Sequence, residues 1–141
     1  MLVATTDRVA IHTTPKVSEQ IHQQTEMRVL YFARHPEEIP TRLRELDREW
    51  DVERALETGS SSLTLFGLVM GSVFSRKWLL LSLGVQGFFL QHALQGWCPP
   101  LPLLRSYGVR TQREIETERC ALLALQEVDK VGAELQSGSG F

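Results

Sequence analysis

The stretch that decides the fold runs from Trp78 to Trp97 and reads WLLLSLGVQGFFLQHALQGW. It holds 20 residues, has no Asp, Glu, Lys or Arg, and carries a Trp at each end. An α-helix needs about 20 predominantly apolar residues to cross a bilayer core, and Trp is enriched at the two interfaces. The stretch therefore predicts a transmembrane helix.

A second apolar segment, Leu63 to Phe74, comes just before it, and the polar turn Ser75-Arg76-Lys77 joins the two. The segment has 12 residues, or 15 if Ser60 to Ser62 are included. On length alone, such a run is more typical of a buried core helix or a re-entrant segment than of a full span. A mean hydropathy of −0.12 also keeps a soluble helical bundle open.

Small and amide residues at helical spacing favour two packed spans. The predicted contact consists of Ser60, Thr64, Gly67 and Gly71 in the first segment and Gly84, Gly87, Gln91 and Gln95 in the second. Such side chains let two helices approach closely in lipid, where apolar burial gives no drive to associate. The Gly67-x-x-x-Gly71 pair alone is weak, because small pairs at this spacing are common. Two matching stripes on consecutive segments predict a tightly packed hairpin.

The regions around the hairpin are charged and amphipathic. Ile39, Leu43, Leu46 and Trp50 lie on one predicted helical face, and Thr111-Gln-Arg-Glu114 has the form of a capping box. We expect a flexible N-terminal arm at 1–14, two amphipathic helices at 15–58, a transmembrane helical hairpin at 59–98, a Pro-rich exit loop at 99–110, an amphipathic C-terminal helix at 111–132 and a flexible tail at 133–141. The predicted fold class is thus all-α: an integral membrane hairpin of two transmembrane helices with flanking amphipathic helices.

Composition excludes several functions. The net charge of −2 argues against a general nucleic-acid binder, which normally has a basic excess. The two cysteines fit no zinc spacing and favour reduced thiols over a disulfide framework. No catalytic constellation, metal site or cofactor motif stands out. The expected role is therefore non-enzymatic.

The end of the apolar stretch carries a family resemblance. QHALQGWCPPLPLLRSYGVRT, with Cys98-Pro99, Gly108 and Thr111, resembles the YgaP-type inner-membrane hairpin family, as does the earlier Glu53-Arg54. The match covers about residues 53–111. It implies a bacterial inner-membrane domain of two transmembrane helices with a largely unassigned role. Some relatives add a rhodanese sulfurtransferase domain, but this chain has neither room for one nor its active-site loop, so we expect a member without it.

Two residues are candidate sites. Cys98 is a possible thiol site that accepts or relays sulfur or redox equivalents, although a helix C-terminus disfavours a thiolate. The alternative is a structural thiol that closes the helix. His92 is a possible ligand for haem or a pigment, since an ionisable residue within a membrane segment is often functional. The alternative is a hydrogen bond to a backbone carbonyl or a lipid head group.

Partners and topology complete the predictions. Gln86 lies away from the other amides, which suggests a second protein contact. We expect the bilayer and either a homo-oligomer or another membrane protein subunit as partners. Three arginines lie within 20 residues on each outer side of the hairpin, against Arg76 and Lys77 in its turn, so both termini are expected in the cytoplasm. The predicted function is an accessory or scaffolding subunit. The alternatives are the Cys98 relay and, more weakly, the His92 cofactor subunit.

Overall fold

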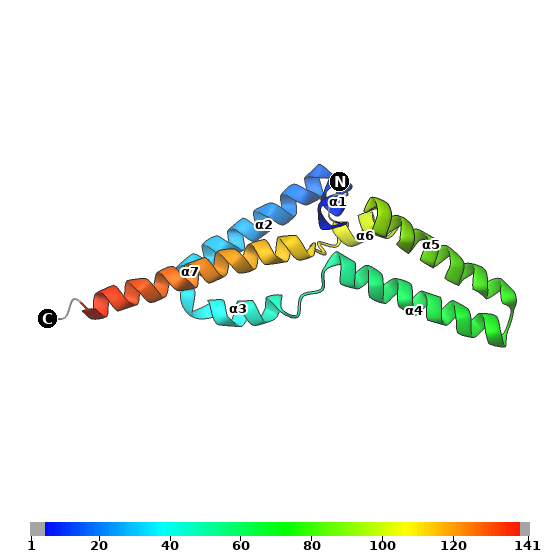
Figure 1. The fold of residues 1–141 in the computed structure, drawn as a ribbon. Helices are drawn as coiled ribbons and strands as arrows, with labels where there is room; N and C mark the ends of the chain where they lie inside the picture. Colours follow the sequence, from blue (N-terminus) through cyan, green and yellow to red (C-terminus); the bar gives the residue numbers. More distant parts are fainter. Residues whose placement is uncertain (1–4, 139–141) are drawn as a thin grey trace. The chain divides into compact units, whose positions relative to one another are not determined.

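Helices make up the regular structure of residues 5–138, the part of the chain that the computed structural model describes (Figure 1). The elements are α1 (Thr5–Ile11), α2 (Pro15–Arg34), η1 (Pro36–Glu38), α3 (Ile39–Leu46), α4 (Val52–Val73), η2 (Arg76–Trp78), α5 (Leu79–Gln95), α6 (Leu101–Ser106) and α7 (Gln112–Gly138). They form two compact units. The hairpin unit comprises Met1–Ser18 and Trp50–Gln112, and the flanking unit comprises Glu19–Glu49 and Arg113–Phe141.

Helices α4 and α5 form the hairpin of the first unit (Figure 1). Asp51 caps α4, since its Oδ1 accepts a hydrogen bond from the backbone N–H of Arg54 at 2.6 Å. An N-cap carboxylate satisfies a free N–H group and favours the positive end of the helix dipole. After α4 ends at Val73, Ser75 accepts a hydrogen bond from the N–H of Lys77 at the start of η2. The chain therefore reverses within a few residues, and α5 runs back along α4.

Gly96 ends α5 in the left-handed conformation, with φ +74°. Glycine enters this region without the clash that a Cβ causes, which makes it the usual residue at this position of a helix end. A Cβ here would also press into Arg8 of α1, whose backbone carbonyl carbon would lie 3.1 Å away. The missing side chain therefore lets α1 approach the end of α5.

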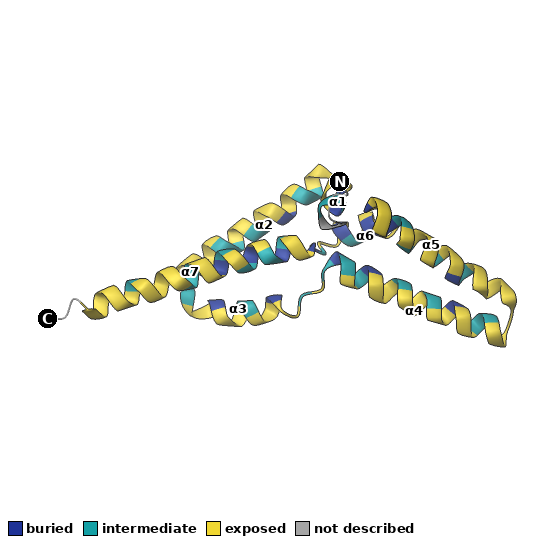
Figure 2. Ribbon diagram, viewed as in Figure 1, coloured by how far each residue is buried: buried dark blue, intermediate teal, exposed yellow. Residues whose placement is uncertain are grey.

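The core of the hairpin unit lies at the open end of the hairpin. Its buried residues are Val9, Val52, Leu56, Cys98 and Leu101, with Phe89, Leu104 and Val109 packed against them. Arg105 is buried in the same unit and donates to the Thr13 hydroxyl and the Val109 carbonyl, both at 3.0 Å. Exposed residues dominate the rest of α4 and α5 (Figure 2). The hairpin therefore extends well beyond its core.

The flanking unit has a separate core that combines apolar and charged side chains. Ile39, Leu46, Ile115 and Leu122 are buried, and Phe32, Leu43 and Leu125 pack against them. Glu118 of α7 is fully buried in this unit and forms ion pairs with Arg28 at 3.0 Å and Arg42 at 2.9 Å. Ile39, Leu43 and Leu46 of the predicted apolar face are thus part of this core, whereas Trp50 lies beyond the end of α3 and is 49% exposed.

The predicted membrane hairpin is wrong, because no helix among residues 5–138 combines the length and the apolar run needed to cross a bilayer. Helix α5 has 17 residues, since η2 takes the residues before it and Gly96 stops it. At about 1.5 Å per residue it reaches only about 26 Å, short of a core of about 30 Å. Helix α4 has 22 residues, but Glu53, Arg54 and Glu57 occupy its first turns. The finding also overturns the inner-membrane location.

Several predicted boundaries also differ. The arm at 1–14 contains α1 from residue 5 onward, the exit loop at 99–110 contains α6, and α7 continues through Gly132 to Gly138. Residues 1–4 and 139–141, the ends of the predicted arm and tail, lie outside the described residues. The second amphipathic helix ends at Leu46, and residues 52–58 belong to α4. Pro102 sits in the first turn of α6, where its missing N–H costs no helix hydrogen bond.

Candidate functional site: the exposed face of the helical hairpin

The two hairpin helices meet through small and polar side chains. Ser82 donates from its hydroxyl to the Thr64 carbonyl at 3.0 Å, and Gln86 donates from its amide to the Thr64 hydroxyl at 2.9 Å. Gly67 lies against Ser82, so that an added Cβ would come 3.2 Å from the Ser82 nitrogen. Gly71 lies against the Leu79 side chain in the same way. Close approach and short hydrogen bonds therefore hold α4 to α5.

The predicted packing stripes are brought together only in part. On α4, Thr64, Gly67 and Gly71 contact α5 as the stripe requires, whereas the hydroxyl of Ser60 donates to the Glu57 carbonyl at 3.2 Å. On α5, a Cβ added at Gly84 or Gly87 would meet no described atom within 4 Å. Gln91 is half-buried and Gln95 is exposed. The predicted α5 stripe is therefore turned away from α4 at its two glycines.

The residues that face α4 from α5 are Ser82 and Gln86, which the sequence analysis did not assign to this contact. Gln86 was expected on the opposite side, as evidence of a second protein contact, and its hydrogen bond to Thr64 corrects that expectation. Ser82 and Gln86 are two polar residues spaced four apart in an apolar run, which places them on one helical face. The longer pattern of Gly84, Gly87, Gln91 and Gln95 predicts a different face.

A leucine seam runs along the outer side of α5. Leu80, Leu83, Leu90 and Leu94, with Gly87 among them, recur at spacings of 3, 4, 3 and 4, and the four leucines are between 60% and 70% exposed. This spacing is the pattern by which two helices interlock in a coiled coil. The exposed apolar residues of α4, including Leu65, Val69 and Val73, extend the apolar surface of the hairpin. Contiguous apolar surface of this kind marks interaction sites.

Cys98, the candidate thiol site, is buried in the core of the hairpin unit and is only 3% exposed. Burial raises the pKa of its thiol, and the backbone hydrogen bond with Leu101 partly opposes that shift. A raised pKa keeps the group as a thiol rather than the reactive thiolate. Cys120, the second cysteine, is exposed on α7 in the other unit. The thiol relay stays a prediction that this environment disfavours.

His92, the candidate ligand, is also buried, and neither of its ring nitrogens has a hydrogen-bond partner among residues 5–138. Burial lowers the pKa of its imidazole, and the positive charge of Arg8 lowers it further. His92 lines a cavity of about 150 Å³ with Glu53, Glu57 and Phe89. Within the described part of the chain, no three His, Cys, Asp or Glu side chains gather so as to hold a metal ion. The cofactor role stays a prediction.

No protein-family model, curated protein or solved structure matches this chain. The resemblance to the YgaP-type family carried by Cys98-Pro99, Gly108 and Thr111 therefore stays a prediction. The α5 leucine seam is an exposed apolar surface whose role the fold of the hairpin unit does not explain.

Proposed function

We propose that this chain is a non-enzymatic association module in which two copies pair through the α5 leucine seam (Leu80, Leu83, Leu90 and Leu94). The observation that carries the proposal is the alternating spacing of three and four along Leu80, Leu83, Gly87, Leu90 and Leu94, in which all four leucines are mostly exposed. Alternation of this kind averages 3.5 residues, the repeat that keeps one helix stripe against another over several turns. The seam supports a scaffolding or accessory role.

The chemistry of α5 favours a second copy over a charged partner. The helix has no Asp, Glu, Lys or Arg between Leu79 and Gln95, and its one histidine is buried. Partners chosen by charge complementarity need charges on both surfaces. An uncharged seam, by contrast, is complementary to itself in a two-fold interface, where the same patch serves both subunits.

The size of the seam fits a stable pair. Full burial of an exposed Leu contributes about 1.5–3 kcal/mol, so four leucines from each copy supply on the order of 10 kcal/mol. The entropic cost of association is about 4–15 kcal/mol. Gly87 lies within the seam and has open space at its Cα, which lets two backbones come close at that point.

Sedimentation equilibrium of the full chain over a range of concentrations tests the proposal. We expect the wild type to sediment as a dimer and Leu83→Glu to sediment as a monomer, because each copy would bury a carboxylate in the seam. Leu135→Glu is the matched control, since Leu135 on α7 is 71% exposed and Leu83 is 70% exposed. The control is expected to remain dimeric. A monomeric wild type, or a Leu83→Glu variant with unchanged mass, would overturn the proposal.

A further inference from the structure

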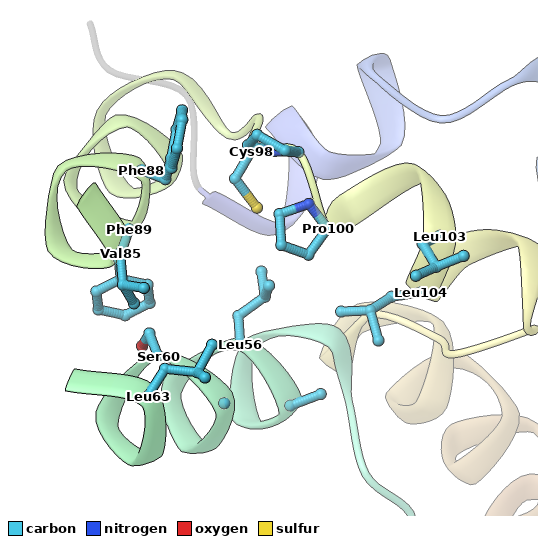
Figure 3. A pocket seen from close by; sticks show the side chains of 13 residues that line it. Leu56, Ser60, Leu63, Val85, Phe88, Phe89, Cys98, Pro100, Leu103 and Leu104 are labelled. Carbon is cyan, nitrogen blue, oxygen red and sulfur yellow. The ribbon is translucent and has the colours of Figure 1, made fainter. Parts of the chain in front are cut away.

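An apolar cavity of about 370 Å³ lies inside the hairpin unit, between α4, α5 and the segment from Cys98 to Leu104. Figure 3 shows Leu56 and Leu63 of α4 facing Val85 and Phe89 of α5, with Pro100 and Leu104 along a further side. The cavity is about 2.5 times as large as the 150 Å³ of an engineered apolar cavity that binds benzene. Its size falls within the range of about 300–1,000 Å³ typical of ligand pockets.

The walls select for a neutral ligand. None of the described residues that line the cavity is charged, and the polar side-chain atoms among them are the Ser60 hydroxyl and the Cys98 sulfur. In Figure 3 the Cys98 sulfur points between Pro100 and Leu56. A charged group placed here would lose its hydration without gaining an opposite charge, and this costs far more than burying an apolar group.

The polar groups allow one hydrogen bond to a ligand. The Ser60 hydroxyl donates its proton to the Glu57 carbonyl at 3.2 Å. Its oxygen keeps lone pairs that accept a hydrogen bond from a ligand hydroxyl. Leu63, Phe88 and Leu103 are each about half exposed and give the cavity an apolar rim through which a chain-like molecule enters.

We propose that this cavity binds a neutral apolar small molecule, an aliphatic chain ending in a single hydroxyl. The apolar chain fills the space between Leu56, Val85 and Leu104, and the hydroxyl donates to the Ser60 oxygen. The site lies within one copy of the hairpin unit. Ligand binding is therefore independent of pairing through the α5 seam.

Octan-1-ol and octanoate test the proposal as matched probes of equal chain length, one neutral and one charged. Binding is followed by tryptophan fluorescence, to which Trp97 beside Cys98 contributes, and by the rate at which N-ethylmaleimide alkylates Cys98 in a Cys120→Ser background. We expect octan-1-ol to change the fluorescence in a saturable way and to slow alkylation by about tenfold, which is a shift of about 1.4 kcal/mol. Octanoate is expected to bind at least about tenfold more weakly.

Two glycine variants provide the control. Gly59 lines the cavity, and a Cβ added there would meet no described atom within 4 Å, so Gly59→Leu places a larger side chain at the cavity wall without a clash at its Cβ. Gly132 on α7 has the same open surroundings outside the hairpin unit. We expect Gly59→Leu to abolish octan-1-ol binding with unchanged helix content, and Gly132→Leu to bind as the wild type does. Equal binding by the two variants, or equal affinity for octanoate, would overturn the proposal.

The same titration is run on Leu83→Glu, whose α5 seam is disrupted. The cavity is intact in this variant, because Leu83 is not one of its lining residues. We expect its affinity for octan-1-ol to equal that of the wild type. Loss of binding in Leu83→Glu would show that the alcohol binds to the seam and not to the cavity.

Discussion

The two units of this chain are both helical, yet different side chains stand out in each of them. In the flanking unit, Glu118 is completely buried, with Arg28 and Arg42 as ion-pair partners. In the hairpin unit, leucines such as Leu80 and Leu83 are mostly exposed along α5. The flanking unit thus pairs a buried carboxylate with two guanidinium groups, while α5 of the hairpin unit exposes a row of leucines.

The difference shows two ways of specifying how helices pack. A buried carboxylate tolerates only an arrangement that keeps its guanidinium partners, so the Glu118 cluster fixes which faces of α2, α3 and α7 meet. The hairpin instead depends on the close approach of α4 and α5 at Gly67 and on the hydrogen bonds of Thr64. Its contacts are local, and its outer face carries exposed apolar side chains.

The largest effect is expected where the charge is buried. Glu118→Gln keeps the shape of the side chain but leaves the two guanidinium groups facing an uncharged amide. Removing one partner of a buried ion pair costs about 3–5 kcal/mol, so we expect a loss of about 3 kcal/mol in the unfolding free energy of the flanking unit. Amide hydrogen exchange of α7, within residues 115–125, measures this loss.

Glu127→Gln is the control on the same helix. Glu127 forms an exposed ion pair with Lys130 at 3.7 Å, and exposed pairs contribute about 0–1 kcal/mol. The control should change the exchange of α7 by less than about 0.5 kcal/mol. If Glu118→Gln lowered the unfolding free energy as little as Glu127→Gln does, the buried charge of Glu118 would not stabilise the flanking unit.

A smaller effect is expected from the close approach in the hairpin. A Cβ added at Gly67 would press against the Ser82 hydroxyl and lie 3.1 Å from the Trp78 carbonyl oxygen. Overpacking of this kind costs about 1–3 kcal/mol. Ala gains about 0.5–1 kcal/mol over Gly inside a helix, so Gly67→Ala should destabilise the hairpin unit by up to about 2 kcal/mol. Urea unfolding followed by Trp fluorescence measures it, because Trp50, Trp78 and Trp97 all lie in this unit.

The matched substitution is Gly84→Ala on the facing helix. Its Cβ would meet no described atom within 4 Å, and Ala is about 0.5–1 kcal/mol better than Gly inside a helix. We therefore expect Gly84→Ala to be neutral or slightly stabilising. Equal losses at Gly67 and Gly84 would restore the predicted contact between two glycine stripes and contradict the observed pairing.

Much of the flanking unit was predictable because its sequence alternates apolar and charged residues. The spacing of three and four predicts one face for Ile39, Leu43, Leu46 and Trp50; the first three belong to the core, whereas Trp50 is exposed because α3 ends at Leu46. The capping pattern beginning at Thr111 predicted a helix, and α7 begins at Gln112. The burial of Glu118 was not predictable, because its partners come from residues about 76 and 90 positions away.

The hairpin was harder to predict because its helices are apolar on nearly every face. A helical period is visible only where polar and apolar residues recur on different faces, and α5 has few polar residues between Leu79 and Leu90. The stretch of 20 uncharged residues is long enough to cross a bilayer only if all of it forms one helix. Residues 76–78 form η2 instead, and the left-handed Gly96 ends α5. The positions of the helix ends, and not the number of apolar residues alone, therefore determine that α5 is too short to cross a bilayer.

The smallest effect expected is a pH dependence confined to the hairpin unit. Burial and the charge of Arg8 lower the pKa of His92, so the unfolded chain binds a proton more readily than the folded one. The contribution of the neutral His92 to stability is fully present above the pKa of about 6.5 that histidine has in the unfolded chain. It is lost as the pH falls, by up to about 1.4 kcal/mol per pH unit. Glu53 acts in the opposite sense, since burial and its acidic neighbours raise its pKa.

Urea unfolding at about pH 7.5 and about pH 5.5 measures this dependence. The unfolding free energy should change less between the two pH values for His92→Leu than for the wild type, and His22→Leu, which alters an exposed histidine of the flanking unit, should match the wild type. The same dependence in all three proteins would show that the proton is taken up elsewhere.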